Sequence, residues 1–201
     1  MLISAVILAG GKGERLGQEK ATLPLGGRTL LERVAGLVAL LSDDLVVVKR
    51  ADQELTFDRG RVVNDLPPYT GALAGLAAGL GAARHPWSLV VACDMPFLSL
   101  PLLRYMLSLT PGQDIVVPRL AAGLEPLHAL YHRRCLGPLR LALAQGQRRL
   151  VSFYPSLRVR QVTLDEIIPW DPNLRSFYNI NTPEDLAQAE IWLGAGAPAT
   201  S

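Results

Sequence analysis

Short apolar runs alternate with longer amphipathic segments along most of the chain. Five runs rich in valine, isoleucine and leucine are nearly continuous in apolar residues, which is typical of strands that are covered on both faces of a sheet. They lie at 2–8, 45–49, 61–64, 88–92 and 114–118. The pattern therefore predicts strands of a parallel sheet.

Segments with helical spacing separate these strands. Residues 29–41, 72–84 and 99–109 are predicted helices, and Thr29 and Glu32 have the spacing of a capping box at the start of the first. The alternation of strands and helices predicts βαβ crossovers, a mostly parallel sheet and the α/β fold class.

The second half of the chain is less regular. Residues 125–131 and 157–162 have the pattern of strands, residues 135–146 have helical spacing, and a last helix is expected from Thr182 onward. We predict a single domain over residues 1–193 and a flexible tail over residues 194–201.

Composition narrows the class of protein. The chain has 201 residues, of which 49% are hydrophobic and 19% charged, which suits one sizeable core and excludes a disordered segment. The net charge of +2 gives no reason to expect nucleic acid as a partner. No apolar stretch approaches the roughly 20 residues that span a bilayer, and the first apolar run lacks the basic region of a signal peptide. A cytoplasmic protein without a membrane partner is expected.

Unusual residue clusters follow three of the predicted strands. LAGGKGER follows the first, NDLPPYTG the third and CDMPF the fourth. Because ligands of open parallel sheets bind beyond the carboxyl ends of the strands, these clusters predict one shared site.

The loop at residues 8–20 is rich in glycine but fits neither common phosphate-binding motif. The dinucleotide fingerprint requires glycine where Leu16 stands, and the NTPase P-loop requires a hydroxyl residue where Gly13 stands. Arg15 and Lys20 could each bind phosphate, and the alternative is a solvated surface loop.

Asp94 is the candidate metal ligand. It follows four apolar residues and precedes Pro96, which prevents the strand from continuing, so the carboxylate is expected at the edge of the sheet. There it could bind Mg²⁺ together with substrate phosphates, or it could only cap a turn. Cys93 beside it is expected to be a buried apolar residue, because no histidine is close in sequence.

Other candidates have a structural alternative of similar weight. Asp65 could bond a nucleoside or start a turn, and Gly71 opens a helix whose glycines recur every fourth residue, which suits a ligand or close packing. Asn179 and Asn181 alternate, so both side chains could reach a metal or phosphate from one face. His128 could lie at the site or satisfy a hydrogen bond within the sheet.

The chain resembles the MobA-type molybdenum cofactor guanylyltransferases of the nucleotide-triphosphate transferase superfamily. The resemblance covers nearly the whole chain and is carried, in order, by LAGG, Arg15-Leu16-Gly17, Lys20, PLGGRTLLERV, GALAG, CDMPF, EPLHALY and FYNINTPEDL.

The resemblance implies a Rossmann-like, three-layer α/β/α domain that uses GTP and Mg²⁺. It implies transfer of GMP to molybdopterin carrying molybdenum, with release of pyrophosphate and with cofactor-delivery proteins as partners. Arg15, Lys20 and Asp94 would be catalytic, and Asp94 would hold the metal. Asn179 and Asn181 match the asparagine pair of the family. The residues implied to bind GTP are Leu8, Ala9, Gly10, Gly11, Lys20, Asp65, Gly71 and Asp94.

The sequence departs from the family pattern at a few positions. Leu16 and Ala72 replace other apolar residues, and the second strand ends in Lys49-Arg50, where some members place an asparagine near the nucleotide. No nucleotide contact is carried over to that strand end. Arg148 and Arg149 could help to bind the anionic pterin, and the alternative is that they belong to a solvated basic face.

Alternative functions are kept open. LAGG and CDMP favour guanine over the cytidine branch, which tends to have LAAG and CDQP. The alternatives are a molybdopterin cytidylyltransferase, another small-molecule nucleotidyltransferase such as a sugar-phosphate one, and a nucleotide-binding regulator that has lost catalysis.

Overall fold

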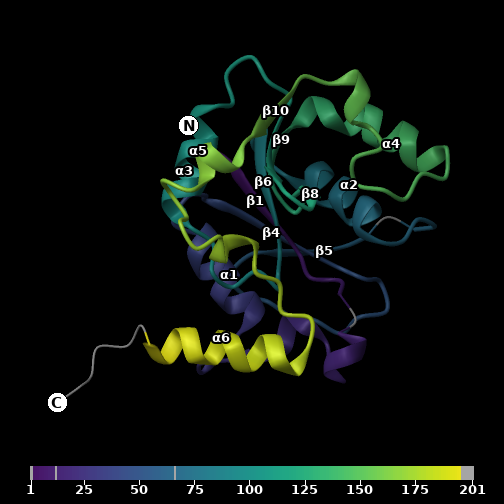
Figure 1. Cartoon of the computed structure of the whole chain (residues 1–201). Helices are drawn as coiled ribbons and strands as arrows, with labels where there is room; N and C mark the ends of the chain where they lie inside the picture. The colour runs from purple at the N-terminus through teal and green to yellow at the C-terminus, as the bar shows by residue number, and fades with distance from the viewer. Residues whose placement is uncertain (1, 12, 66, 196–201) are drawn as a thin grey trace.

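A mixed, mostly parallel sheet forms the centre of the molecule, and helices cover both of its faces (Figure 1). The computed structural model describes residues 2–11, 13–65 and 67–195. Within these residues the sheet has eight strands in the order β10-β7-β9-β6-β1-β4-β5, and β8 pairs with β7. This confirms the predicted α/β fold class.

The strands agree closely with the apolar runs of the sequence. Those of the central sheet are β1 (Ser4–Leu8), β4 (Asp44–Lys49), β5 (Arg61–Asn64), β6 (Trp87–Ala92), β7 (Ile115–Leu120), β8 (Gly123–Leu124), β9 (His128–His132) and β10 (Val159–Val162). A separate hairpin, β2 (Pro24–Leu25) with β3 (Arg28–Thr29), was not predicted, because two-residue strands leave no readable periodicity.

The helices divide between the two faces of the sheet. The α-helices are α1 (Leu30–Val38), α2 (Ala72–Ala82), α3 (Leu100–Ser108), α4 (Leu136–Ala144), α5 (Leu164–Ile167) and α6 (Pro183–Ala195). In Figure 1, α1, α3 and α5 lie on one side of the sheet and α2 and α4 on the other. Short 3-10 helices are η1 (Glu14–Leu16), η2 (Lys20–Thr22), η3 (Arg133–Cys135), η4 (Tyr154–Ser156) and η5 (Arg175–Phe177).

The alternation of side chains along β1 builds both layers of the core. Ala5 and Ile7 belong to the cluster under α1, α3 and α5, whereas Val6 belongs to the cluster under α2 and α4. This is why the buried strands have almost no polar positions. A smaller cluster, which includes Leu25 and Ala189, joins the β2–β3 hairpin to α6.

Two of the eight strands run against the others: β8 is antiparallel to its neighbour β7, and β9 is reversed within the main path of the sheet. β9 lies between β6 and β7 and is antiparallel to both, whereas β1, β4, β5 and β6 are mutually parallel. The sequence predicted the strand but not its direction. The connection from β7 through β8 to β9 is too short for a helical crossover, so the chain turns straight back.

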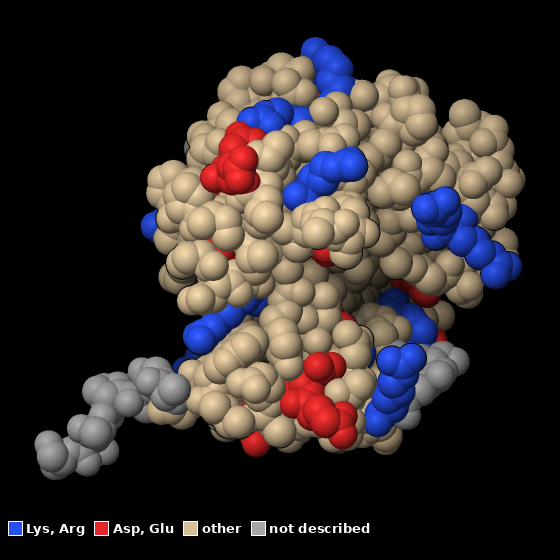
Figure 2. All heavy atoms as spheres, viewed as in Figure 1, with Lys and Arg blue, Asp and Glu red and all other residues tan. Residues whose placement is uncertain are grey.

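Three further features concern the C-terminal helix, the hydropathy of the helices and the charges on the surface. Helix α6 continues through Ala195, two residues beyond the predicted end of the domain at residue 193, and residues 196–201 lie outside the described residues. No helix in the described part of the chain is long and apolar enough to span a membrane. Basic side chains are scattered over the face in Figure 2, and both charge signs lie around the hollow below α2.

Helix α2 packs against β1 at a position where it has no side chain. A Cβ on Gly79 would overlap Cγ1 of Val6 and lie 3.1 Å from Cγ2 of Val48. The glycine that recurs at position 79 therefore serves close packing of α2 against the sheet. The sheet and the helix approach each other through backbone, and this sets how deeply α2 sits.

Replacing Gly79 with alanine should destabilise the protein, although alanine is the better helix former. Overpacking against Val6 costs about 1–3 kcal/mol, which outweighs a propensity gain of about 1 kcal/mol. Gly36→Ala is the matched control, because Gly36 is inside α1 and an added Cβ there meets no atom within 4 Å. Urea unfolding should show G79A below and G36A above the wild-type midpoint; equal gains in both variants would contradict this account.

Candidate functional site

A cavity of about 280 Å³ lies at the carboxyl edge of the parallel strands. The residues after β1, β4, β5 and β6 line it, together with the start of α2 and the segment before α6. Most of the predicted site residues lie here, namely Leu8, Gly10, Gly11, Lys20, Asp65, Gly71, Asp94 and Asn179.

The register between β1 and β6 brings the glycine loop and the acidic residue together. Leu8 pairs with Ala92, and the Cys93 N–H donates to the Leu8 carbonyl at 3.1 Å. The two strands thus end at the same level. Gly10 and Asp94, two residues beyond these ends, therefore line the same cavity.

Lys20 links three distant parts of the chain. Its Nζ lies 2.5 Å from Asp94 Oδ2 and 2.5 Å from Asn181 Oδ1. The Ile180 N–H donates to the Asp94 carbonyl at 3.0 Å, which fixes the asparagine segment beside the acid. The Lys20 and Asp94 side chains are only 13% and 14% exposed, so little water screens their attraction.

Asp94 also keeps one buried oxygen free of protein partners. Oδ1 is inaccessible and has no hydrogen-bond partner among the described residues, which is unusual for a buried carboxylate oxygen. No cluster of three or more His, Cys, Asp or Glu side chains suited to a metal occurs in the described ranges. A cation here would need water or substrate oxygens, and Mg²⁺ has that preference.

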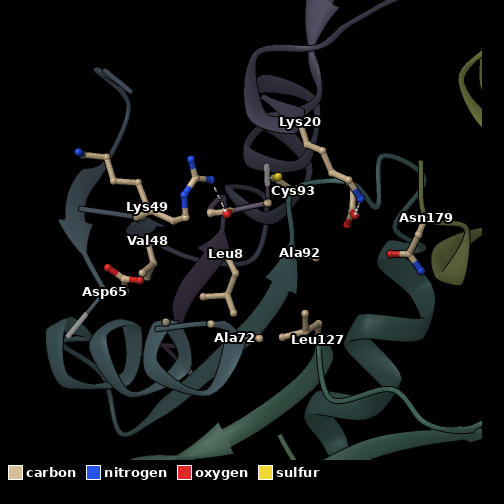
Figure 3. A pocket seen from close by; sticks show the side chains of 16 residues that line it. Leu8, Lys20, Val48, Lys49, Asp65, Ala72, Ala92, Cys93, Leu127 and Asn179 are labelled. Carbon is tan, nitrogen blue, oxygen red and sulfur yellow. Dashed lines mark hydrogen bonds and ion pairs between the residues drawn. The ribbon is translucent and has the colours of Figure 1, made fainter. Parts of the chain in front are cut away.

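The floor of the cavity is apolar and its ends are polar. Leu8, Ala72 and Leu127 lie between Asp65 at one end and Asn179 at the other (Figure 3). A flat apolar group held over this floor would have hydrogen-bonding groups within reach at both ends. The Asp65 carboxylate already accepts from the Ala51 N–H at 3.2 Å, which helps to fix its position.

Several lining residues were not predicted. They are Val48, Lys49, Arg50, Ala72, Gly75, Ala92, Cys93 and Leu127. Lys49 ends a predicted strand and Arg50 directly follows it, so the rule that ligands bind beyond strand ends could have included both residues. Leu127 precedes the reversed strand β9, and nothing in the sequence revealed that direction.

Other predicted residues do not line the cavity. Arg15 is exposed on η1, and Ala9 is buried with its carbonyl accepting from the Gln53 side chain at 3.1 Å. Arg148 and Arg149 are exposed on the loop after α4. Asn181 contacts Lys20 instead. The roles expected for these residues stay predictions.

Cys93 and His128 are both buried within the sheet region. Burial raises the pKa of the Cys93 thiol far above neutrality, which excludes it as a thiolate nucleophile in this state. His128 is fully buried, its ring lies 4.7 Å from that of Phe177, and neither ring nitrogen has a partner in the part of the chain described. It neither lines the cavity nor makes the hydrogen bond that the sequence allowed.

Comparison with known proteins identifies the family. Residues 5–161 match the model of the MobA-like NTP transferase domain. The chain belongs to this family. As a member of the MobA-like NTP transferases it is a nucleotidyltransferase, and molybdenum cofactor biosynthesis is the process its named relatives share.

Relatives and solved structures cover almost the whole chain. A molybdenum cofactor guanylyltransferase from Desulfosudis oleivorans is 37% identical over 196 residues, which is 96% of this chain and 97% of the relative. A probable one from Pelotomaculum thermopropionicum is 36% identical over 188 residues, covering 94% of this chain and 92% of the relative. The structure of molybdopterin-guanine dinucleotide biosynthesis protein A from Archaeoglobus fulgidus superposes with a TM-score of 0.81 at 28% identity, covering 96% and 100% of the two chains.

His128 should make stability depend on pH between its unfolded and folded pKa values. Burial lowers its pKa from 6.5 to about 4. Above about pH 6.5 both states are neutral and the full stability is present. As the pH falls the unfolded state binds a proton first, so up to about 3 kcal/mol is lost by pH 4. Urea unfolding at several pH values should show this slope, and it should be reduced in H128F; an equal slope in both proteins would contradict the assignment.

Proposed function

We propose that this nucleotidyltransferase moves GMP from GTP to molybdopterin-bound molybdenum cofactor, forming molybdopterin guanine dinucleotide and pyrophosphate with the help of Mg²⁺. The observation that carries the proposal is the convergence of the glycine loop, Lys20 and Asp94 on one cavity. Guanine and the molybdopterin acceptor are supported by the names of the relatives and by LAGG and CDMP in this chain.

The reaction is an in-line displacement at phosphorus. An oxygen of the acceptor's terminal phosphate attacks the α-phosphorus of GTP, and the bond to the bridging oxygen breaks with its electron pair leaving on pyrophosphate. Negative charge accumulates on the α-phosphoryl oxygens and on the leaving group. Catalysis then requires positioning and charge stabilisation, and no covalent enzyme intermediate.

The glycine loop and the apolar floor would position GTP. Backbone N–H groups of Gly10 and Gly11 would bind phosphate oxygens, because glycine lets an anion approach the main chain closely. The purine would lie over Leu8 and Ala72, with Asp65 and the backbone around Ala9 contacting the nucleoside. Gly71, at the start of α2, leaves that end of the helix open to the ligand.

Lys20 and Asp94 would stabilise the charge of the phosphates in two different ways. Asp94 would hold Mg²⁺, with Asn179 and Asn181 as nearby amide oxygens, and the ion supplies charge stabilisation for the phosphates. Lys20 would turn toward the phosphates, where a cation about 4 Å from one charge gains on the order of 4 kcal/mol at an effective dielectric near 20. Arg15 is proposed to reach the phosphates from η1.

Replacing Asp94 with alanine should lower turnover by about 10²-fold or more, the scale for losing a preorganised charge stabiliser. The assay is pyrophosphate release with GTP, Mg²⁺ and molybdopterin carrying molybdenum. The melting temperature of D94A should be compared with that of the wild type in parallel, because the change also leaves Lys20 without its carboxylate partner. Near wild-type turnover of D94A at limiting Mg²⁺ would overturn the metal assignment.

The same assay separates the alternatives. Faster release with CTP, or greater thermal stabilisation by CTP than by GTP, would replace the guanine assignment with the cytidine one. Binding of GTP without any release of pyrophosphate would indicate a non-catalytic regulator.

The loop after α4 is the proposed acceptor site. This loop carries the two exposed arginines Arg148 and Arg149, whose charge suits an anionic pterin. The R148A/R149A double variant should weaken binding of the anionic pterin and leave GTP affinity intact. Titration with each ligand tests this, and equal loss of both affinities, or of neither, contradicts it.

A further inference from the structure

The turn after β4, residues 50–53, ties the glycine loop to the sheet. We propose that Arg50 is a positioning residue that keeps the peptide groups of this loop in the orientation that binds phosphate. The inference deepens the proposed nucleotide site and rests on it.

One guanidinium group joins the two ends of the loop. Arg50 donates from Nη1 to the Gly10 carbonyl at 2.7 Å, and its Nη2 lies 2.7 Å from Glu19 Oε1. Arg50 is 20% exposed in its side chain, and its Cγ would lie 3.1 Å from a Cβ on Gly10. The arginine stem therefore packs against the loop backbone, and glycine at position 10 leaves it room.

Gln53 anchors the preceding peptide in the same way. Its side chain is buried, donates from Nε2 to the Ala9 carbonyl at 3.1 Å, and accepts from the Arg50 N–H at 3.3 Å. Two consecutive loop carbonyls, those of Ala9 and Gly10, are thus held by the turn after β4.

Holding these carbonyls also directs the N–H groups. In a trans peptide the C=O and the following N–H point in opposite directions. The N–H groups of Gly10 and Gly11 therefore point away from Gln53 and Arg50, and neither has a hydrogen-bond partner among the residues that the structure describes. Because glycine rotates freely in φ and ψ, loss of the anchors would let these peptides turn and scatter the anion-binding groups.

The charges around Arg50 separate this role from direct phosphate binding. Two carboxylates compensate it: Glu19, and Asp52, whose Oδ1 lies 3.0 Å from Arg50 Nε. If Arg50 were a phosphate ligand, removing either carboxylate would free its charge and strengthen anion binding. If Arg50 positions the loop, removing Glu19 weakens anion binding although the site becomes more positive.

The test compares Glu19→Ala with Asp52→Ala. Each variant removes one carboxylate that pairs with Arg50. Calorimetric titration uses inorganic tripolyphosphate, which reports on the loop whatever base the enzyme prefers, and then GTP and guanosine. E19A should bind tripolyphosphate and GTP about tenfold more weakly, the scale of losing one hydrogen bond to a charged group. D52A should change these affinities less than about twofold, since exposed ion pairs contribute little. Guanosine affinity should stay the same in both variants.

Two further variants keep the result interpretable. Glu19→Gln retains the shape of the side chain and should show a smaller loss in the same direction as E19A, at an unchanged melting temperature. Arg50→Lys should bind tripolyphosphate no better than R50A, because one ammonium cannot span Gly10 and Glu19 together.

Each remaining outcome counts against one proposal. Wild-type affinity in E19A, tighter binding in both E19A and D52A, rescue by R50K, or no tripolyphosphate binding by the wild type would each overturn the positioning role of Arg50. A preference for CTP over GTP would overturn the guanine assignment and leave this inference intact.

Discussion

The parallel pairing of β1 with β6 is the constraint on which the site depends. The bond from the Cys93 N–H to the Leu8 carbonyl ends both strands at one level, and the chain on either side then diverges into a glycine loop and an acidic turn. A slip of one residue in this register would reverse the faces on which Ile7 and Val91 are buried. The core thus enforces the alignment that brings a backbone anion site next to a carboxylate.

The ammonium group of Lys20 and the carboxylate of Asp94 compensate each other's charge beside the cavity. Lys20 pairs with Asp94, and its Nζ also donates a hydrogen bond to Asn181 Oδ1, so the mostly buried carboxylate has a compensating charge beside it. A triphosphate supplies new acceptors for the ammonium group and new ligands for a cation at once. Under the proposed function, nucleotide and metal should therefore bind together, because each relieves the desolvation that the other would impose.

The sequence was sufficient for those parts of the fold that depend on local pattern. Continuous apolar runs identified the strands because both faces of the sheet are buried, and the residues after β1, β5 and β6 predicted where the cavity lies. The direction of β9 and the β2–β3 hairpin were not readable, since short connections and two-residue strands carry no periodicity. Arg50 was passed over because its partners, Gly10 and Glu19, come from a loop 31 to 40 residues earlier, and charge in a sequence does not reveal what it will contact.

The glycines of α2 that face β1 have a consequence for how ligand specificity can evolve. Leu8, Val48 and Gly75 belong both to the packed layer beneath α2 and to the wall of the cavity, so the height of the helix sets the depth available to a ligand. A substitution that adds side-chain volume between Gly79 and Val6 would move α2 away from the sheet and change the shape of the cavity wall. Under the proposed function, discrimination between large and small bases would then depend on residues that do not line the cavity, such as Val6 and Gly79.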